Sequence, residues 1–243
     1  MTPAPPRAAF APLDADRAAR LDRDGFLLLR GAIPAGAIAP LRAAFEAGEL
    51  PGPAWPVPRG ADWRHARVDL DPAVREICRL PVLLAGAAHR LGAPFFLMQV
   101  EGREPRPGGG AQLLHRDAPA SVPPRFVSAL AFLDPFGPAN GATCVVAGTH
   151  RGEGLAAPAG AAHPAAQVIA GEAGDVLLFD AALLHGATRN GAGAPRRALL
   201  ITWAAQAELE TQRQTKALRA IRMEEELFSP PAVSADANEG AAA

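Results

Sequence analysis

Between residues 94 and 203 the sequence repeats one pattern: an apolar run of strand length is followed by a cluster of Gly, Pro, Asn or Asp. No helical pattern separates most of these runs. Many short strands divided by turn clusters predict a β-sandwich or a β-barrel. They argue against a doubly wound parallel sheet, in which helices alternate with strands. The runs are "PFFLMQV", "AQLLH", "RFVSALAFLD", "ATCVVAG", "AQVIAG", "DVLLFD" and "RALLITW".

The segments on either side of this region have helical patterns. Before it, a strand over Phe26–Arg30 interrupts the helices, the Pro-rich stretch 51–60 ends one of them, and Pro81 separates the two in residues 71–91. We therefore expect one mainly β domain with flanking helices. Its predicted parts are a flexible arm over 1–12, a single domain over 13–228 (helical part 13–92, β core 93–204, C-terminal helix 205–228) and a disordered tail over 229–243.

Charge and composition exclude several classes of protein. The formal net charge of −1 and the lack of a long basic run argue against nucleic-acid binding. The sequence has no apolar run long enough for a membrane span and no apolar signal core, so we expect a cytoplasmic protein. Cys78 and Cys144 fit no metal-binding spacing and are interpreted as small buried residues in a reducing compartment. We expect a monomer or homodimer whose partner is a small-molecule substrate.

One polar group interrupts the apolar runs, in the segment "LLHRDAP", where His115 and Asp117 stand two residues apart. In a strand, residues i and i+2 point to the same side, so both side chains can reach one object. His185 also follows an apolar strand and a short turn. Two neutral imidazoles and one carboxylate form the facial triad of non-heme Fe(II) oxygenases, which leaves adjacent metal positions free.

Two arginines, Arg196 and Arg197, open the strand "RRALLITW". An arginine at such a place can pair with a carboxylate through the planar fork of its guanidinium. Neighbouring residues of a strand point to opposite faces, so only one of the two can enter a pocket. The residues themselves leave open which one: Arg196 shares its face with Leu200 and Thr202, and Arg197 shares the other with apolar residues.

Five segments, in this order, resemble a known family: "DGFLLLRGAIP", "LLHRD", "LAFLDPFGPANGATCVVAGTHRG", "GDVLLFDAALLHGATRN" and "RRALLITW". Together they are similar to the phytanoyl-CoA dioxygenase (PhyH)-like family of non-heme Fe(II)/2-oxoglutarate-dependent oxygenases. The resemblance implies a double-stranded β-helix core, of the jelly-roll or cupin-like kind, that holds Fe(II). It also implies 2-oxoglutarate and O2 as cosubstrates.

The resemblance assigns roles to individual residues. Arg196 lies 11 residues after His185, which is the family's spacing for the arginine that binds the distal carboxylate of 2-oxoglutarate. The iron ligands that it implies are His115, Asp117 and His185.

Two positions depart from the family pattern. Ala147 stands where proline is usual, and Ala187 stands where serine is common, with Thr188 next to it. Thr188 is therefore our candidate for the hydroxyl that assists Arg196. Gln99, a polar residue within "FFLMQV", is a further candidate for a contact with the cosubstrate or with the substrate.

The resemblance implies a dioxygenase that hydroxylates, or otherwise oxidises, a C–H bond of a small organic molecule and releases succinate and CO2. In halogenating relatives a small residue replaces the carboxylate ligand, so Asp117 predicts a hydroxylase. Two other functions remain open from the residues. One is a zinc-dependent hydrolase that uses the same His/Asp/His site. The other is a non-catalytic jelly-roll binding module.

The remaining polar features receive structural interpretations. His150 and Asn140 lie in turn sequences and are expected to shape the chain there. The segment 102–110 is expected to be a mobile loop, either a lid or a plain surface loop. Nearby loops contain arginines that could favour an anionic substrate, although Glu104 offsets part of that charge: Arg103, Arg106 and Arg125.

Overall fold

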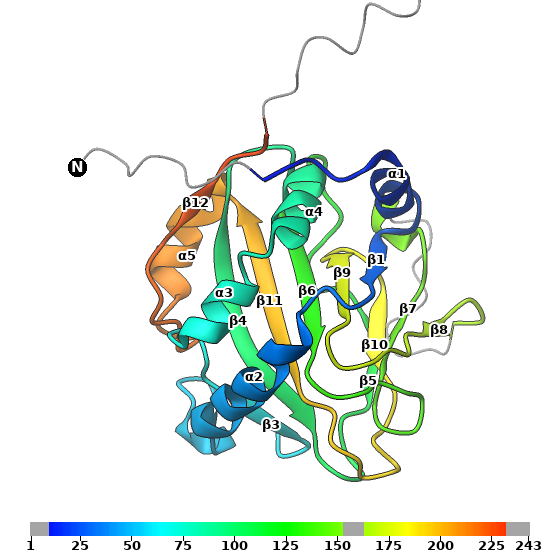
Figure 1. The fold of residues 1–243 in the computed structure, drawn as a ribbon, viewed down its shortest axis with the longest axis vertical. Helices are drawn as coiled ribbons and strands as arrows, with labels where there is room; N and C mark the ends of the chain where they lie inside the picture. The colour runs from blue at the N-terminus through cyan, green and yellow to red at the C-terminus, as the bar shows by residue number, and fades with distance from the viewer. Residues whose placement is uncertain (1–9, 153–162, 232–243) are drawn as a thin grey trace, which may run out of the picture.

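The computed structural model describes residues 10–152 and 163–231, and two antiparallel sheets dominate this part of the chain (Figure 1). The major sheet contains β1 (Phe26–Leu29), β2 (Glu49–Leu50), β3 (Trp63–Ala66), β4 (Phe95–Pro105), β6 (Phe126–Phe132), β9 (Val176–Asp180), β11 (Ala198–Ala205) and β12 (Leu227–Phe228). The minor sheet contains β5 (Gln112–His115), β7 (Thr143–Val145), β8 (Gln167–Val168) and β10 (His185–Ala187).

The order of the strands shows a double-stranded β-helix. The major sheet runs β1-β9-β6-β11-β4-β3-β2, with β12 paired to β4, and the minor sheet runs β5-β10-β7-β8. The inner faces of the two sheets share one apolar cluster, which includes Phe132 and Phe179 of the major sheet and Val145 of the minor sheet. The predicted fold class, mainly β with flanking helices, is confirmed.

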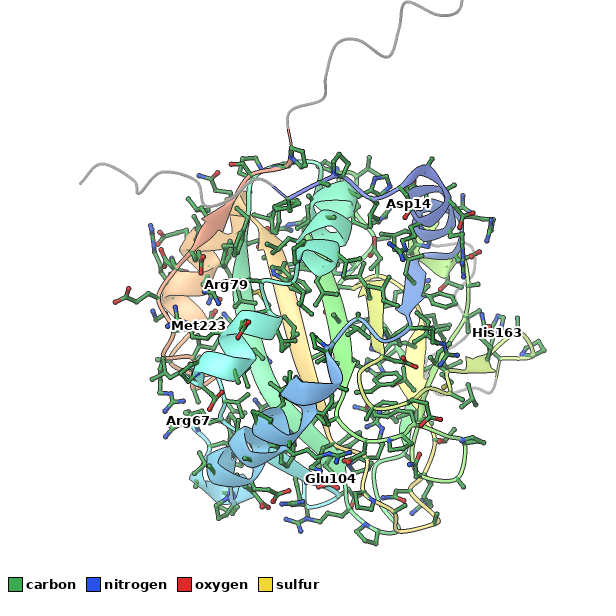
Figure 2. The ribbon with its side chains drawn as sticks, in the orientation of Figure 1. Asp14, Arg67, Arg79, Glu104, His163 and Met223 are labelled. Atoms are coloured by element: carbon green, nitrogen blue, oxygen red, sulfur yellow. The ribbon has the colours of Figure 1, made fainter. Side chains whose placement is uncertain are left out.

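The helices are α1 (Ala15–Asp24), α2 (Ala35–Gly48), α3 (Pro72–Ile77), α4 (Pro81–Leu91) and α5 (Leu209–Thr215), with short 3-10 turns at η1 (Gly52–Ala54), η2 (Thr149–Arg151) and η4 (Gln206–Glu208). Helices α2, α3 and α4 lie on the outer face of the major sheet, and α5 lies at its side next to β12 (Figure 1). Asp14, labelled in Figure 2, caps α1 by accepting a hydrogen bond from the Arg17 N–H at 2.9 Å. Pro81 is the first residue of α4, a position that proline favours.

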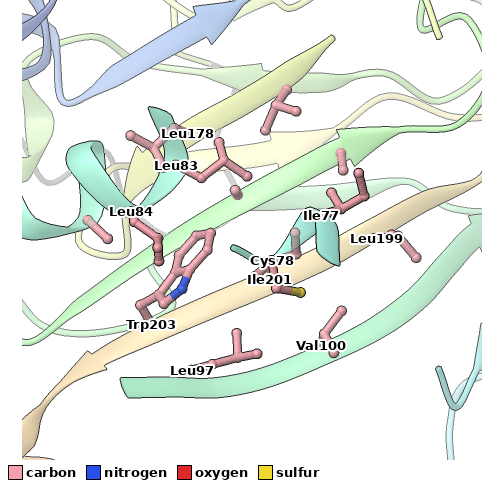
Figure 3. Packing of buried hydrophobic residues seen from close by; sticks show 14 of the residues in the cluster. Ile77, Cys78, Leu83, Leu84, Leu97, Val100, Leu178, Leu199, Ile201 and Trp203 are labelled. Atoms are coloured by element: carbon pink, nitrogen blue, oxygen red, sulfur yellow. The ribbon is translucent and has the colours of Figure 1, made fainter. Parts of the chain in front are cut away.

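The main hydrophobic core fills the space between these helices and the major sheet (Figure 3). Ile201 and Trp203 of β11 face it, together with Leu178 of β9 and Leu83 of α4, and all four are essentially inaccessible to solvent. Because side chains alternate along a strand, the neighbouring residues of β11, such as Leu200, face the opposite way, toward the minor sheet.

The predicted C-terminal helix over 205–228 is wrong in its extent. Helix α5 ends at Thr215, and the chain then turns and returns as β12 along the edge of β4. Beyond this turn a distant carboxylate binds the chain: buried Asp69 accepts hydrogen bonds from the backbone N–H groups of Arg222 and Met223, and it also binds the Arg222 guanidinium. These contacts hold the segment in a non-helical path.

The predicted mobile loop over 102–110 is also wrong in its first half. Strand β4 continues to Pro105 because β3 pairs with it over Gly102–Pro105. Strand β3 follows a Pro-rich stretch and carries no strand pattern that the sequence makes evident. A lid that begins at residue 102 is therefore excluded, and the connection between β4 and β5 is limited to residues 106–111.

Most of the predicted arm (1–12) and tail (229–243) lies outside the described residues. At the end of the arm, Phe10 is buried and its ring makes an edge contact with Phe95, with centroids 6.3 Å apart. Within residues 10–152 and 163–231, no helix has the length and apolar character needed to cross a membrane.

Candidate metal centre and cosubstrate site

Three potential metal ligands meet where β5 and β10 pair. His115 and His185 lie directly opposite each other in this pair, with ring centroids 4.4 Å apart, and Asp117 follows the end of β5. The Asp117 carboxylate lies near both rings: one oxygen is 3.6 Å from the His115 Nε2 and the other is 3.6 Å from the His185 Nε2. The three ligand atoms all lie within 4.8 Å of one another.

The backbone fixes both rings. The Nδ1 atom of His115 lies 2.8 Å from the carbonyl oxygen of Leu113, and that of His185 lies 2.9 Å from the carbonyl oxygen of Leu183. When Nδ1–H donates to a carbonyl, the lone pair of the neutral imidazole is on Nε2. Both lone pairs therefore point to Asp117, and the orienting hydrogen bond is of the kind seen behind metal-ligating histidines.

The surroundings of His115, Asp117 and His185 also shift the pKa values of all three side chains. Burial opposes the ionisation of Asp117, but its contact with His115 and the charge of both histidines hold the pKa of this carboxyl below its usual value. Burial lowers the pKa of His185, while contact with Asp117 raises the pKa of His115. At neutral pH the site thus offers an ionised carboxylate and a neutral His185 imidazole, in a donor set that suits a divalent transition metal.

Arg196 is buried beside this centre without a counter-ion. Its side chain lies against the Phe136 ring, with the guanidinium carbon 4.1 Å from the ring centroid, and Nη2 donates to the Thr143 hydroxyl at 3.2 Å. Among the described residues no carboxylate forms an ion pair with this guanidinium, and its Nε has no hydrogen-bond partner. Burial, with a contribution from the charge of Arg103, lowers the pKa of Arg196 to about 9, although the charge of Glu104, which accepts a hydrogen bond from the Arg196 backbone N–H, acts in the opposite direction. The arrangement favours binding of an anion.

Arg197 is in the opposite situation. Its Nε and Nη2 donate to the two carboxylate oxygens of Asp134 at 2.8 and 3.0 Å, and its Nη1 donates to Glu46 at 2.8 Å. The sequence alone left open which of the two arginines enters the pocket, and these contacts favour Arg196. Arg196 points inward and is free to bind a ligand, whereas Arg197 is already paired.

The hydroxyl beside Arg196 belongs to Thr143, and the expectation for Thr188 is corrected. Thr188 donates its hydroxyl to the backbone oxygen of Ala142 at 3.3 Å instead. Thr143 lies directly opposite Ala187 in the pairing of β7 with β10. A residue on the neighbouring strand thus supplies the hydroxyl in place of the serine that is common at position 187. No motif near Thr143 in the sequence predicts this role.

A cavity of about 250 Å³ opens beside the metal centre. Gln99 lies in its wall, as does Asp117, whose side chain is 40% exposed. Sequence reasoning placed Arg103 in a loop, but the structure places it on β4 with its side chain in this wall, where Glu101 accepts from its Nε at 2.5 Å. The lining residues are Met98, Gln99, Arg103, Asp117, Ala118, Phe126, Ser128, Ala181, Leu200 and Thr202.

Two other polar residues serve the framework. The Nε2 of His150 lies 3.2 Å from the backbone oxygen of Asp22, and its ring packs against Gly25, where any side chain would collide with it. Asn140 accepts a hydrogen bond from the Gly137 N–H and donates to the oxygen of Pro135, so it holds its own turn. Neither residue lines the cavity.

A model of the phytanoyl-CoA dioxygenase (PhyH) family matches residues 21–198 of the chain. The chain belongs to this family. Fe(II) and 2-oxoglutarate are the metal and the cosubstrate of PhyH enzymes, so the cofactor prediction is confirmed, and the protein is an Fe(II)/2-oxoglutarate-dependent enzyme of the oxygenase type.

Solved structures share the fold of this PhyH protein. HygX from Streptomyces hygroscopicus, with nickel and 2-oxoglutarate bound, is 19% identical over 80% of this chain and 88% of that chain, with a TM-score of 0.68. SnoN, an alpha ketoglutarate dependent epimerase from nogalamycin biosynthesis, is 21% identical over 78% and 82%, with a TM-score of 0.62. EctD from S. alaskensis, with 2-oxoglutarate and 5-hydroxyectoine, is 21% identical over 81% and 78%, with a TM-score of 0.61.

Proposed function

We propose that this PhyH-family enzyme hydroxylates a C–H bond of a small molecule and consumes 2-oxoglutarate and O2. One observation carries the proposal: an open set of two nitrogen ligands and one oxygen ligand lies close to a buried arginine that lacks a counter-ion. A zinc hydrolase would need the ligands but would have no use for the arginine. A non-catalytic binding module would need neither the shared orientation of the two histidine rings nor the buried charge of Arg196.

In this proposal His115, Asp117 and His185 hold Fe(II) through the two Nε2 atoms and the carboxylate. They contribute one negative charge and leave the side toward the cavity open. Bound iron supplies the redox chemistry, in which one atom of O2 enters the substrate C–H bond, the other enters succinate, and 2-oxoglutarate loses CO2. The chain itself supplies geometry and a shielded site.

Arg196 binds the distal carboxylate of 2-oxoglutarate and so orients the cosubstrate. Its partner Thr143 lies opposite Ala187, two residues along β10 from His185, so the guanidinium lies roughly 7 Å from the level of the metal ligands. This separation suits a molecule that carries a carboxylate at one end and a metal-binding group at the other. The bound carboxylate also supplies the counter-charge that the buried guanidinium lacks.

Two rings hold the guanidinium in place for this contact. Phe136 packs against it, and the Trp63 ring lies on β3 with its centroid 5.7 Å from the guanidinium carbon. These apolar surfaces exclude water, so the charge-assisted pair forms in a medium of low dielectric constant, where it is strong.

Asp117 favours hydroxylation over halogenation, because its carboxylate occupies a metal position that a halide would require. The epimerase SnoN has a similar fold, so epimerisation is the closest competing outcome. The two reactions differ in mass balance: hydroxylation adds one oxygen atom to the product, whereas epimerisation leaves its mass unchanged.

The test is a reconstitution of the full chain with Fe(II) and ascorbate. We expect 2-oxoglutarate-dependent O2 uptake with formation of succinate, and calorimetric binding of 2-oxoglutarate that requires Arg196 and a divalent metal. Under ¹⁸O2, a product with one labelled oxygen supports hydroxylation. A product of unchanged mass and inverted configuration would replace it with epimerisation, and zinc-dependent hydrolysis without 2-oxoglutarate binding would overturn the proposal altogether.

A further inference from the structure

A row of three polar side chains crosses the middle of the major sheet. Gln99 of β4 lies opposite Thr202 of β11, and Thr202 lies opposite Ser128 of β6, so the three stand side by side on the same inner face. The hydroxyl oxygens of Ser128 and Thr202 are 3.2 Å apart. All three residues line the cavity beside the metal centre.

Packing alone does not require polar groups here. Ser128 is 1% exposed and Thr202 is 8% exposed, in the two central strands of the sheet. Farther along the same face, these strands carry the apolar residues Leu130, Leu200 and Phe132. Buried hydroxyls cost free energy unless hydrogen bonds offset the loss of water, so a row of them in a cavity wall indicates a use for them.

The row retains hydrogen-bonding capacity for a ligand. A hydroxyl has one donor and two acceptor sites, so the single bond between Ser128 and Thr202 leaves one donor and several acceptor sites unused. Gln99 uses one N–H in a long contact with Glu101, at 3.4 Å, which leaves its second N–H and its carbonyl oxygen. The row therefore offers donors and acceptors together.

Position separates this row from the cosubstrate site. Thr202 is six residues beyond Arg196 along an extended strand, a distance of roughly 20 Å. Leu200 lies between them, and it lines the cavity together with Asp117. Cosubstrate that spans from Arg196 to the metal ligands thus leaves the end of the cavity at Gln99, Thr202 and Ser128 free for substrate.

The size and the rest of the wall restrict what fits. The volume of about 250 Å³ corresponds to roughly eight molecules of liquid water, which is enough for one six-membered ring with its substituents. Phe126 and Met98 add apolar surface on which the C–H face of a ring can pack. A larger substrate would have to project out of the cavity.

We propose that the row Gln99–Thr202–Ser128 is the substrate subsite and that it binds a polyhydroxylated ring, of the sugar or cyclitol class, rather than an alkyl or acyl chain. This rests on the proposed function. Ring hydroxyls are donors and acceptors at once, as are the side chains of the row. An alkyl chain would leave the polar groups of the row unpaired, and sites built to bind a hydroxyl reject analogues that lack it by orders of magnitude.

The test measures binding of ring probes by ligand-observed NMR, with and without Fe(II) and 2-oxoglutarate under argon. The probes are myo-inositol and the methyl glycosides of glucose, galactose and mannose, with cyclohexylmethanol as the apolar ring of similar size. The variant is Ser128→Ala/Thr202→Val, which removes both hydroxyls with little change in shape. Replacing both partners of a hydrogen bond in this way is nearly neutral for stability. Thr211→Val, on the exposed side of α5, is the matched control.

We expect at least one polyhydroxylated probe to bind the wild-type chain and the Thr211→Val control alike. In the double variant its affinity should fall about tenfold or more, the equivalent of one lost hydrogen bond, while cyclohexylmethanol gains affinity. If the double variant does not fold, Gln99→Met takes its place, and the same loss of affinity for the polyhydroxylated probe is expected. The proposal is overturned if no polyhydroxylated probe binds, if the variants bind these probes as tightly, or if the wild-type chain prefers cyclohexylmethanol.

The outcome is separable from that of the proposed function. Hydroxyl-dependent ring binding in a chain that neither binds 2-oxoglutarate nor forms succinate would keep the subsite and reject the oxygenase mechanism. Succinate formation without hydroxyl-dependent ring binding would do the reverse.

Discussion

The two faces of the major sheet are made by alternate residues of the same strands, and they differ in nearly every property. On the outer face, Val127, Ile201 and Trp203 pack against helices and are completely buried. On the inner face, Ser128 and Thr202 line a cavity. The comparison teaches that the outer face serves packing throughout, whereas the inner face combines an apolar cluster with a stretch of residues that lines the cavity and is available for ligands.

The largest effect is expected on the inner side, at the metal centre. His185→Ala should abolish Fe(II) binding, because two remaining ligands hold a labile divalent metal poorly, and calorimetry on the full chain measures this. The free energy of unfolding should change less than it does for an outer-face truncation. His163→Ala is the matched control, since His163 lies beside β8 at the periphery (Figure 2). Iron binding by His185→Ala at wild-type affinity would refute the assignment of the centre.

The outer face should show the opposite behaviour. Trp203→Ala removes the largest fully buried side chain of the core and should lower the free energy of unfolding by about 3–5 kcal/mol. That is a large part of the ~5–15 kcal/mol typical of a whole domain. Urea denaturation measures it, with the folded fraction still binding 2-oxoglutarate. A loss below about 1 kcal/mol would show that the two faces share the stability more evenly than their burial indicates.

The two arginines just before β11 sharpen the comparison, because they are adjacent residues with opposite surroundings. Arg196→Ala should weaken 2-oxoglutarate binding by about 2–5 kcal/mol, since truncation leaves the carboxylate unpaired in a buried site. Arg196→Lys should recover part of this, because lysine lacks the planar fork. Arg197→Ala should leave the cosubstrate affinity within a few fold. The reverse pattern in a titration would mean that the strand is shifted by one residue.

The smallest effect concerns Asp134, which lies just beyond the end of β6 and pairs with Arg197 and Arg42. Burial opposes its ionisation, but hydrogen bonds and charge from Arg197 outweigh this and lower the pKa of its carboxyl. The folded-state pKa lies below the unfolded value of about 3.9, so the pair stabilises the fold above that pH and the stabilisation is lost as pH falls through the folded pKa. Urea denaturation at pH 6 and below pH 4 should show a flatter acid response in Asp134→Asn than in the wild-type chain.

The sequence predicts the parts of this protein that depend on neighbours along the chain. His115 and Asp117 are two residues apart, and His185 and Arg196 are 11 residues apart. Both spacings can be recognised in the sequence without a structure. The strands of the core are readable for the same reason, since period and turn residues are local signals. These expectations needed no knowledge of how the strands pair.

The failures depend on contacts between distant segments. Thr143 replaces Thr188 beside Arg196 because β7 pairs with β10. The segment after the short C-terminal helix takes a non-helical path in which Asp69 binds its backbone, more than 150 residues away in the sequence. Arg103 reaches the cavity wall because β3 extends β4. Each of these follows from strand register or a long-range hydrogen bond, and neither is encoded in the spacing of nearby residues.

The carbonyl groups that orient the two histidines have a consequence for how such an enzyme changes over evolution. Each carbonyl belongs to a residue two positions before its histidine, Leu113 before His115 and Leu183 before His185. The hydrogen bonds that orient the rings thus lie within two short peptides, and Asp117 is the one residue of the described cavity wall whose side chain contacts both rings. Mutations can therefore change the residues at the substrate end of the cavity while the orientation of both histidine rings is kept. An ancestral enzyme can acquire new substrates in this way without first losing its metal.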